Sequence, residues 1–164
     1  MRYAKYPLWI VGIFLLLTIL SMALGAWIFF LIKVWLGIAF IVLNFVMLFV
    51  CMRYRCKYCY YHGKRCYMGL GKLAKIFKKG NAKEFSKTKN LVPALVFMMI
   101  TIFSPIIAGI IALIVSFSWL MLVLLIVYVM IAIIPNFFLK KSLCCDRCIQ
   151  GKLGCPAYEG MKGK

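Results

Sequence analysis

Acidic side chains are almost absent from this sequence of 164 residues, which has three aspartates and glutamates against 21 lysines and arginines. The three are Glu84, Asp146 and Glu159, and none of them lies within an apolar run. Proton relays and cation transporters use carboxylates inside the membrane, so this absence argues against an ion-coupled transporter. Histidine is scarce as well, since His62 is the only one. A catalytic general base therefore has few candidates, and an enzyme is the less favoured class.

Hydrophobic residues make up 66% of the chain, far more than in a soluble domain. Uncharged runs that approach the about 20 residues needed for a membrane-crossing helix recur along it. We expect four spans, at Leu8–Gly25, Val34–Cys51, Leu91–Val115 and Trp119–Leu139. The residues around Trp27–Phe30 and Ser116–Ser118 are expected to close two hairpins, and Pro135-Asn136 to kink or end the fourth span.

Basic residues gather on one side of these spans. Arg2 and Lys5 precede the first span, twelve basic residues lie from Arg53 to Lys89, and six follow the fourth span. Cytoplasmic loops are enriched in lysine and arginine, so we expect the N-terminus, the central loop and the C-terminus in the cytoplasm. Lys33 alone lies near the other side, where we expect it to snorkel to the interface. A cleaved signal peptide is the alternative interpretation of the first run.

One cysteine pattern, C-x2-C-x6-C, occurs twice at an offset of 89 residues. Its members are Cys56, Cys59 and Cys66 in the first loop and Cys145, Cys148 and Cys155 in the second. Each triplet follows a pair of apolar runs, so the chain divides into two repeats, residues 1–89 and 90–164. The sequence predicts an all-α integral membrane protein with four transmembrane helices, arranged as two tandem hairpins, each followed by a cytoplasmic three-cysteine loop. A pseudo-twofold axis along the membrane normal would bring the two loops together.

These six cysteines are predicted metal ligands. The cytoplasm keeps thiols reduced, which favours metal binding over disulfides, and two thiols three residues apart can reach one ion from a tight turn. Zinc is the expected metal and an iron–sulfur cluster the alternative. His62 and Cys144 are further candidate ligands, and Cys56, Cys59, His62 and Cys66 could also hold a separate zinc. Cys51 is interpreted as a packing residue, with palmitoylation as the alternative.

Two local resemblances extend this hypothesis. The segment from Cys145 to Cys155 resembles half of the binuclear zinc cluster of fungal transcription factors, and the segment from Cys56 to Cys66 resembles it less closely. In that family two such halves share six thiolates between two zinc ions, which implies a joint site here. The spacing also resembles degenerate ferredoxin runs, with Pro156 after the last cysteine, which implies iron–sulfur clusters that each need a further ligand. The resemblances cover only these loops, and no whole-chain family is recognised.

The basic loop between the hairpins predicts a membrane-surface helix. Leu70–Lys79 places apolar residues on one face and lysines on the other, before Gly80-Asn81 stops the helix. The lipid bilayer, with anionic headgroups at this loop, is the expected partner, together with proteins of a membrane complex; nucleic acid is not expected. The predicted function is a non-catalytic scaffold, metal sensor or subunit of a membrane complex. An electron-transfer protein and a metal-dependent lipid-modifying enzyme are the alternatives.

Overall fold

The computed structural model describes residues 3–153, 155 and 158, without the side chains of Lys83, Asn136, Phe137 and Lys152. Arg2, Pro156 and Glu159, which entered the sequence analysis, lie outside the described residues. Regular secondary structure in the described part is helical, apart from one isolated bridge between Tyr3 and Cys148.

Four long helices dominate the chain. They are α1 (Leu8–Ile32), α2 (Val34–Tyr54), α4 (Thr88–Val115) and α5 (Trp119–Ile134), the last continued by a π-helical segment, Pro135–Cys145. All four are long and apolar enough to cross a membrane, α5 together with its π-helical continuation. Only 17% to 19% of each apolar stretch is buried inside the protein, so most of its hydrophobic surface faces outward. Such large apolar surfaces are typical of lipid contact, and the helices indicate a multi-pass membrane protein.

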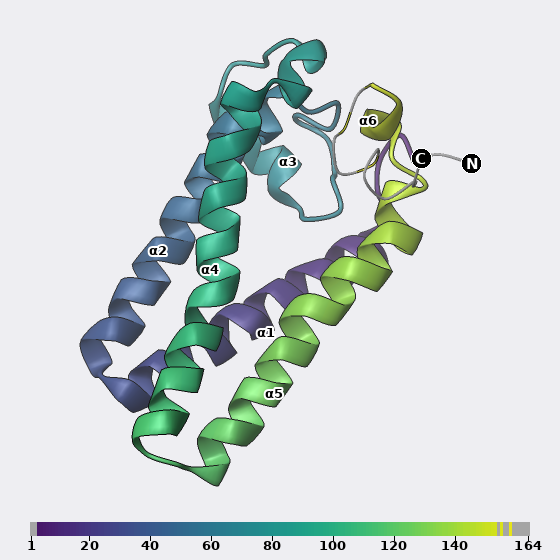
Figure 1. Ribbon diagram of the computed structural model, residues 1–164. Helices are drawn as coiled ribbons and strands as arrows, with labels where there is room; N and C mark the ends of the chain where they lie inside the picture. The colour runs from purple at the N-terminus through teal and green to yellow at the C-terminus, as the bar shows by residue number, and fades with distance from the viewer. Residues whose placement is uncertain (1–2, 154, 156–157, 159–164) are drawn as a thin grey trace.

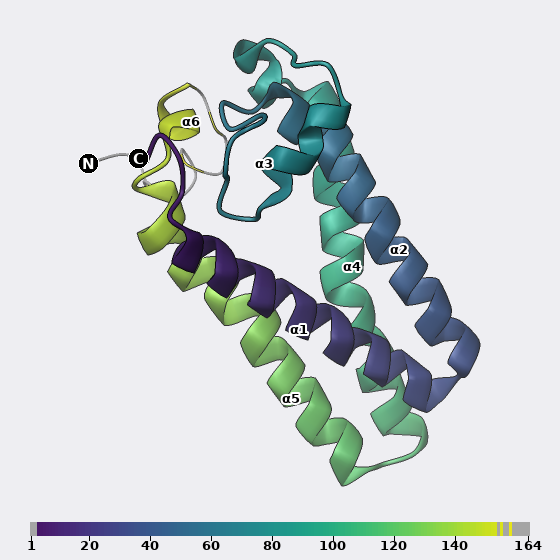
Figure 2. The ribbon, with the colours of Figure 1, turned by 180° about the vertical axis from the view of Figure 1, so that it is seen from behind.

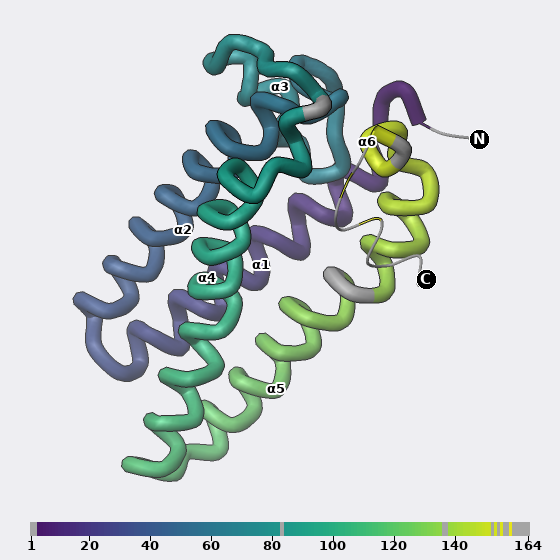
Figure 3. The backbone as a smooth tube through the Cα atoms, turned by 45° about the horizontal axis from the view of Figure 1, so that its top comes forward, coloured from purple at the N-terminus to yellow at the C-terminus, as the bar shows by residue number. Residues whose placement is uncertain are grey.

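The helices pack as two pairs that form a V. Helix α1 packs against α5 and α2 against α4, and α1 also contacts α4. Figures 1 and 2 show that the pairs lie close together near the hairpin bends and diverge toward the opposite end. If the first hairpin (α1 and α2) and the second (α4 and α5) exchanged places, the α1–α5 pair would become the α4–α2 pair. The pairings therefore agree with a twofold repeat. The cysteine loops lie at the open end of the V (Figure 3), and Figures 1 and 2 show α3 (Leu70–Leu73) between its arms.

The first hairpin bends later than the sequence indicates. The expected bend around Trp27–Phe30 is wrong, because α1 continues through these residues to Ile32. Lys33 alone separates α1 from α2, with an extended backbone at φ −159°. A Cβ on Gly37 would lie 2.5 Å from the Phe30 ring, so the missing side chain lets this ring pack across a one-residue bend.

The fourth span changes its helical form at the predicted proline. Helix α5 ends at Ile134, and Pro135–Cys145 continues as a π-helix. Proline has no N–H and its ring clashes with the carbonyl four residues earlier, so it kinks or breaks an α-helix. Helix α4 continues through Pro93 and Pro105, whereas α5 ends at Pro135. The prediction of a kink or end at Pro135 is confirmed. The π-helical segment then carries the chain directly to the second cysteine loop.

The predicted surface helix is shorter than expected. Helix α3 and a 3₁₀ turn, Ala74–Ile76, cover the first part of Leu70–Lys79, and the chain is extended at Phe77. The ring of Phe77 lies 5.5 Å from that of Phe49 on α2, which draws the chain out of the helix. Leu73 and Ile76 are left exposed, at 56% and 79%.

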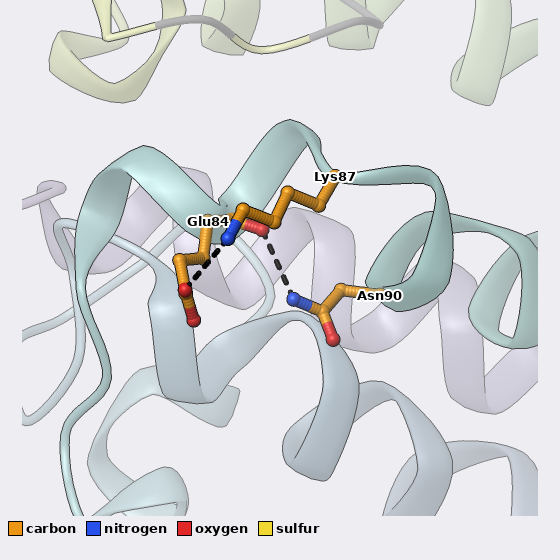
Figure 4. A network of polar contacts seen from close by, with 3 residues as sticks. All are labelled: Glu84, Lys87 and Asn90. Carbon is orange, nitrogen blue, oxygen red and sulfur yellow. Dashed lines mark hydrogen bonds and ion pairs between the residues drawn. The ribbon is translucent and has the colours of Figure 1, made fainter.

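A small polar network fixes the start of α4, after the 3₁₀ turn Ala82–Ser86 (Figure 4). The Lys87 ammonium lies 2.8 Å from a Glu84 carboxylate oxygen. The side-chain amide of Asn90 donates to the Glu84 backbone carbonyl at 3.0 Å. Lys87 is the N-cap residue of α4 and makes no side-chain cap bond, so these contacts hold the turn against the helix instead.

Candidate functional site: the two cysteine loops

The first cysteine loop leaves α2 in a tight turn. A 3₁₀ turn, Cys56–Tyr58, begins at the first cysteine, and the Cys59 amide donates to the Cys56 carbonyl at 3.3 Å. The His62 amide then donates to the Cys59 carbonyl at 3.0 Å. This turn is the geometry that the C-x2-C spacing predicts. It holds the first two thiols near each other on a compact stretch of backbone.

Gly71 closes the first loop on Cys66. Its amide lies 3.3 Å from the Cys66 sulfur and donates to it, while its carbonyl accepts from the Gly63 amide at 2.8 Å. A Cβ at Gly71 would collide with the carbonyl oxygens of Tyr61 and Lys64. An N–H donated to sulfur stabilises a thiolate, and such bonds surround metal-bound cysteines.

The second cysteine loop repeats the turn of the first. Cys145 ends the π-helical segment, and the Cys148 amide donates to the Cys145 carbonyl at 3.2 Å. Helix α6 (Ile149–Lys152) follows, and the Tyr158 amide donates to the Cys155 carbonyl at 2.9 Å. Both C-x2-C pairs therefore adopt a turn closed by the same backbone hydrogen bond.

Hydrogen bonds join the two loops directly. The Tyr60 amide donates to the side-chain oxygen of Gln150 at 2.7 Å. The Tyr61 hydroxyl accepts from the Ile149 amide at 3.2 Å and donates to the Tyr3 carbonyl at 2.7 Å. We call these three contacts the clasp. It holds segments 58 to 90 residues apart in sequence.

The segment before α1 lies between the two loops. The Tyr3 amide donates to the Arg147 carbonyl in the second loop, and the Tyr6 amide to the Arg65 carbonyl in the first, each at 3.1 Å. Tyr6 is fully buried, and its hydroxyl donates to the Cys144 carbonyl at 2.8 Å. Burial and the neighbouring thiols raise the pKa of Tyr6, so this hydroxyl keeps its proton and its donor role.

Cysteines from both loops share one buried cluster. Cys66 and Cys144 are buried in it beside Tyr6, and Cys59 and Cys148 pack against it. The expectation that the loops meet at one end of the helices agrees with this contact. Within each triplet the thiols also lie close enough to interact electrostatically: Cys56 with Cys59 and Cys66, and Cys145 with Cys148 and Cys155.

The pKa of the Cys59 thiol is affected by these neighbouring thiols. Burial is the main cause that raises its pKa, to about 12, while a backbone hydrogen bond at Tyr61 acts in the opposite direction. Neighbouring Cys148, Cys66 and Cys155 raise it further, so thiols of both loops lie within electrostatic reach of Cys59. Without a cation nearby, this thiol is protonated at neutral pH.

The predicted ligands are neighbours here, but they do not form a coordination shell. Among the residues that the structure describes, no three histidine, cysteine, aspartate or glutamate side chains are arranged to hold a metal ion. The eight cysteines, all of them described, are free thiols. His62 lies in the first loop, where its Nε2 contacts the Phe77 carbonyl at 2.9 Å. The metal site therefore stays a prediction.

The residues that join the loops were not singled out by the sequence. Tyr3, Tyr6, Tyr61 and Gln150 are not ligand positions of a metal motif, and tyrosine near a membrane surface is common without any other role. The dense tyrosines around the first triplet were the available signal, because a buried hydroxyl must find a partner.

No protein-family model, curated protein or solved structure matches this chain.

Proposed function

We propose that this chain is a multi-pass membrane protein whose two cysteine loops hold zinc jointly, in a non-catalytic role as scaffold, metal sensor or subunit of a membrane complex. The observation that carries this proposal is the clasp, in which Tyr60, Tyr61 and Gln150 hold the two loops together. A joint site would staple the diverging ends of the two helix pairs, which otherwise contact each other mainly near the bends.

The donor chemistry supports zinc. Thiols with raised pKa values bind protons in the metal-free protein, and a divalent cation would replace those protons and relieve the repulsion between thiolates. A cysteine side chain has a single rotatable bond before its sulfur, so rotamer changes can turn neighbouring sulfurs toward one ion. The Gly71 N–H already donates to the Cys66 sulfur, as an outer-shell partner would.

A structural role suits the remaining polar groups better than catalysis. In the described part of the chain, His62 Nε2 contacts a backbone carbonyl and Glu84 pairs with Lys87. Both groups are thus already engaged with a partner. Asp146, the third such group in the described part, lies close enough to Cys145 to interact with it electrostatically. A site held by cysteines from both loops would be closed, which is typical of structural zinc.

The loop between the hairpins is suited to contact anionic lipid. Leu73 and Ile76 are exposed apolar residues on the short helical stretch, next to the exposed lysines Lys72 and Lys75. Apolar side chains that enter the headgroup region beside lysines bind anionic membranes, at about 1 kcal/mol per lysine. This contact would hold the first cysteine loop at the membrane surface.

Metal analysis tests the joint site. We would purify the full chain anaerobically and compare the wild type with Cys59→Ser, Cys148→Ser and, as a control outside both triplets, Cys51→Ser. We expect colourless protein with about one to two zinc ions per chain, and loss of zinc and of thermal stability in either loop variant. If each variant lost only the zinc bound by its own loop, the joint site would be wrong and each loop would hold a separate ion. Brown protein with iron and acid-labile sulfide, or protein without metal, would overturn the proposal.

A further inference from the structure

A second sulfur-rich place lies inside the helix bundle, apart from the cysteine triplets. A partly open cavity of about 90 Å³ is lined by all four long helices and by Met68 of the first cysteine loop. Three more methionines line it, Met22 from α1, Met47 from α2 and Met98 from α4, and the buried Asn44 and Thr101 contribute polar groups. Thr18, Ser21 and Tyr128 add hydroxyl groups, so the four thioethers are the soft ligands of a lining whose other polar groups are neutral.

Chemistry narrows what this cavity can hold, since its volume has room for several water molecules and therefore for one metal ion. Its lining, all of it within the described residues, includes no carboxylate, histidine or basic side chain. Hard divalent cations need several charged oxygen ligands, so calcium and magnesium do not fit. Thioether sulfur instead prefers soft monovalent ions such as Cu(I).

A row of sulfur atoms leads from this cavity to the cysteine loops. Asn44, Met47 and Cys51 lie on one face of α2, three and four residues apart. The Cys51 sulfur is 3.7 Å from the Met47 sulfur. Cys51 in turn interacts electrostatically with Cys56, the first ligand candidate of the first loop. A soft cation could thus pass from thioether to thiol ligands along a single helix.

We propose that the methionine-lined cavity binds one Cu(I) ion and that Cys51 connects it to the cysteine loops. This site goes beyond the zinc site and does not depend on it. Neutral thioethers leave the single positive charge of the ion uncompensated, so the copper–sulfur bonds must offset the cost of burying it, and that cost is lower for a monovalent ion than for a divalent one. Methionine as a flexible packing residue is the competing explanation, and it predicts no metal affinity.

Anaerobic titration of the full chain with Cu(I), against a chromophoric Cu(I) chelator, tests this proposal. The cavity variant is Met47→Leu with Met98→Leu, and the matched control is Met99→Leu with Met130→Leu, whose side chains are 49% and 53% exposed on α4 and α5. Methionine-to-leucine changes conserve volume, so both variants should fold. Thermal unfolding of both variants checks this.

The thiols of the chain also bind Cu(I). We therefore expect the wild type and the control to bind one Cu(I) more than the thiols take up, and the cavity variant to bind this additional ion at least about tenfold more weakly. Mutation of residues that contact only the ligands of a metal already lowers metal affinity on this tenfold scale. The Cys59→Ser and Cys148→Ser variants should keep this Cu(I), which separates it from the zinc site. Equal affinity in cavity and control variants, or copper lost only from the loop variants, would overturn the proposal.

Discussion

The backbone amide of Tyr60 donates a hydrogen bond to the side-chain oxygen of Gln150 at 2.7 Å, across 90 residues of sequence. Tyr60 follows the first C-x2-C pair directly, and Gln150 lies two residues after the second. One polar side chain therefore recognises the backbone of the other repeat. Gln150 is buried, at 2% exposure, and Tyr60 is half-buried, so the bond is partly shielded from water and losing it would leave a shielded amide unpaired.

Gln150→Leu should loosen the two loops without changing the helices. Leucine has a similar volume but leaves the Tyr60 amide without its acceptor. We expect the free energy of unfolding to fall by about 1 kcal/mol. The loss is limited because the substitution also removes the Gln150 side-chain nitrogen, which is buried without a partner among the described residues. Faster alkylation of Cys59 and Cys148 should accompany it, measured by mass spectrometry after timed exposure to a maleimide. Unchanged alkylation would contradict the role of this bond.

Tyr61→Phe should have a larger effect, because one hydroxyl serves two partners. Its loss leaves the Tyr3 carbonyl and the Ile149 amide unpaired in a crowded region. We expect the free energy of unfolding to fall by about 1–3 kcal/mol. Denaturant unfolding in detergent measures this. Tyr60→Phe is the control, since the clasp uses only the backbone of Tyr60, and a similar loss in both variants would argue against the clasp.

Gly71→Ala should disrupt the first cysteine loop. The added methyl group would collide with two backbone carbonyls and displace the N–H that donates to Cys66. We expect a cost of about 1–3 kcal/mol, the usual range for overpacking, together with weaker zinc retention. Gly12→Ala is the matched control, because a Cβ there meets nothing within 4 Å, and it should be neutral or slightly stabilising. Equal stability and zinc content in both variants would contradict the role of Gly71.

Labelling of introduced cysteines tests the orientation predicted from the lysines and arginines. Ser116 lies in the α4–α5 bend and Ser86 in the loop between the hairpins, and both are exposed. With the basic loop in the cytoplasm, a membrane-impermeant maleimide should label Ser116→Cys on intact cells, and Ser86→Cys only after the cells are opened. The wild-type chain gives the background from native thiols. The reverse pattern would invert the topology.

The sequence predicted the helices well because their signal is local. The helices α1, α2 and α5 begin at the predicted residues Leu8, Val34 and Trp119, where polar or charged residues give way to apolar runs. The bend at Lys33 was misplaced because it depends on the contact of Phe30 with Gly37, which composition does not reveal. The surface helix was overextended because the Phe49–Phe77 contact competes with helix propensity.

For the site, the spacing of the cysteines predicted their turns but not what joins them. The C-x2-C turns depend on hydrogen bonds within four residues, and both occur. The contacts of Tyr6, Tyr61 and Gln150 join distant segments, and tyrosine beside a membrane has an equally good interfacial interpretation. Only the packed fold distinguishes the two. The metal itself, predicted from the same spacing, awaits the measurements above.

The interval between Tyr60 and Gln150 also has a consequence for biosynthesis. On the ribosome, the first loop emerges long before its partner, and a whole hairpin must be made and inserted in the meantime. During this time the three thiols of the first loop have no second triplet beside them. Synthesis of the second loop is therefore the step that completes the junction.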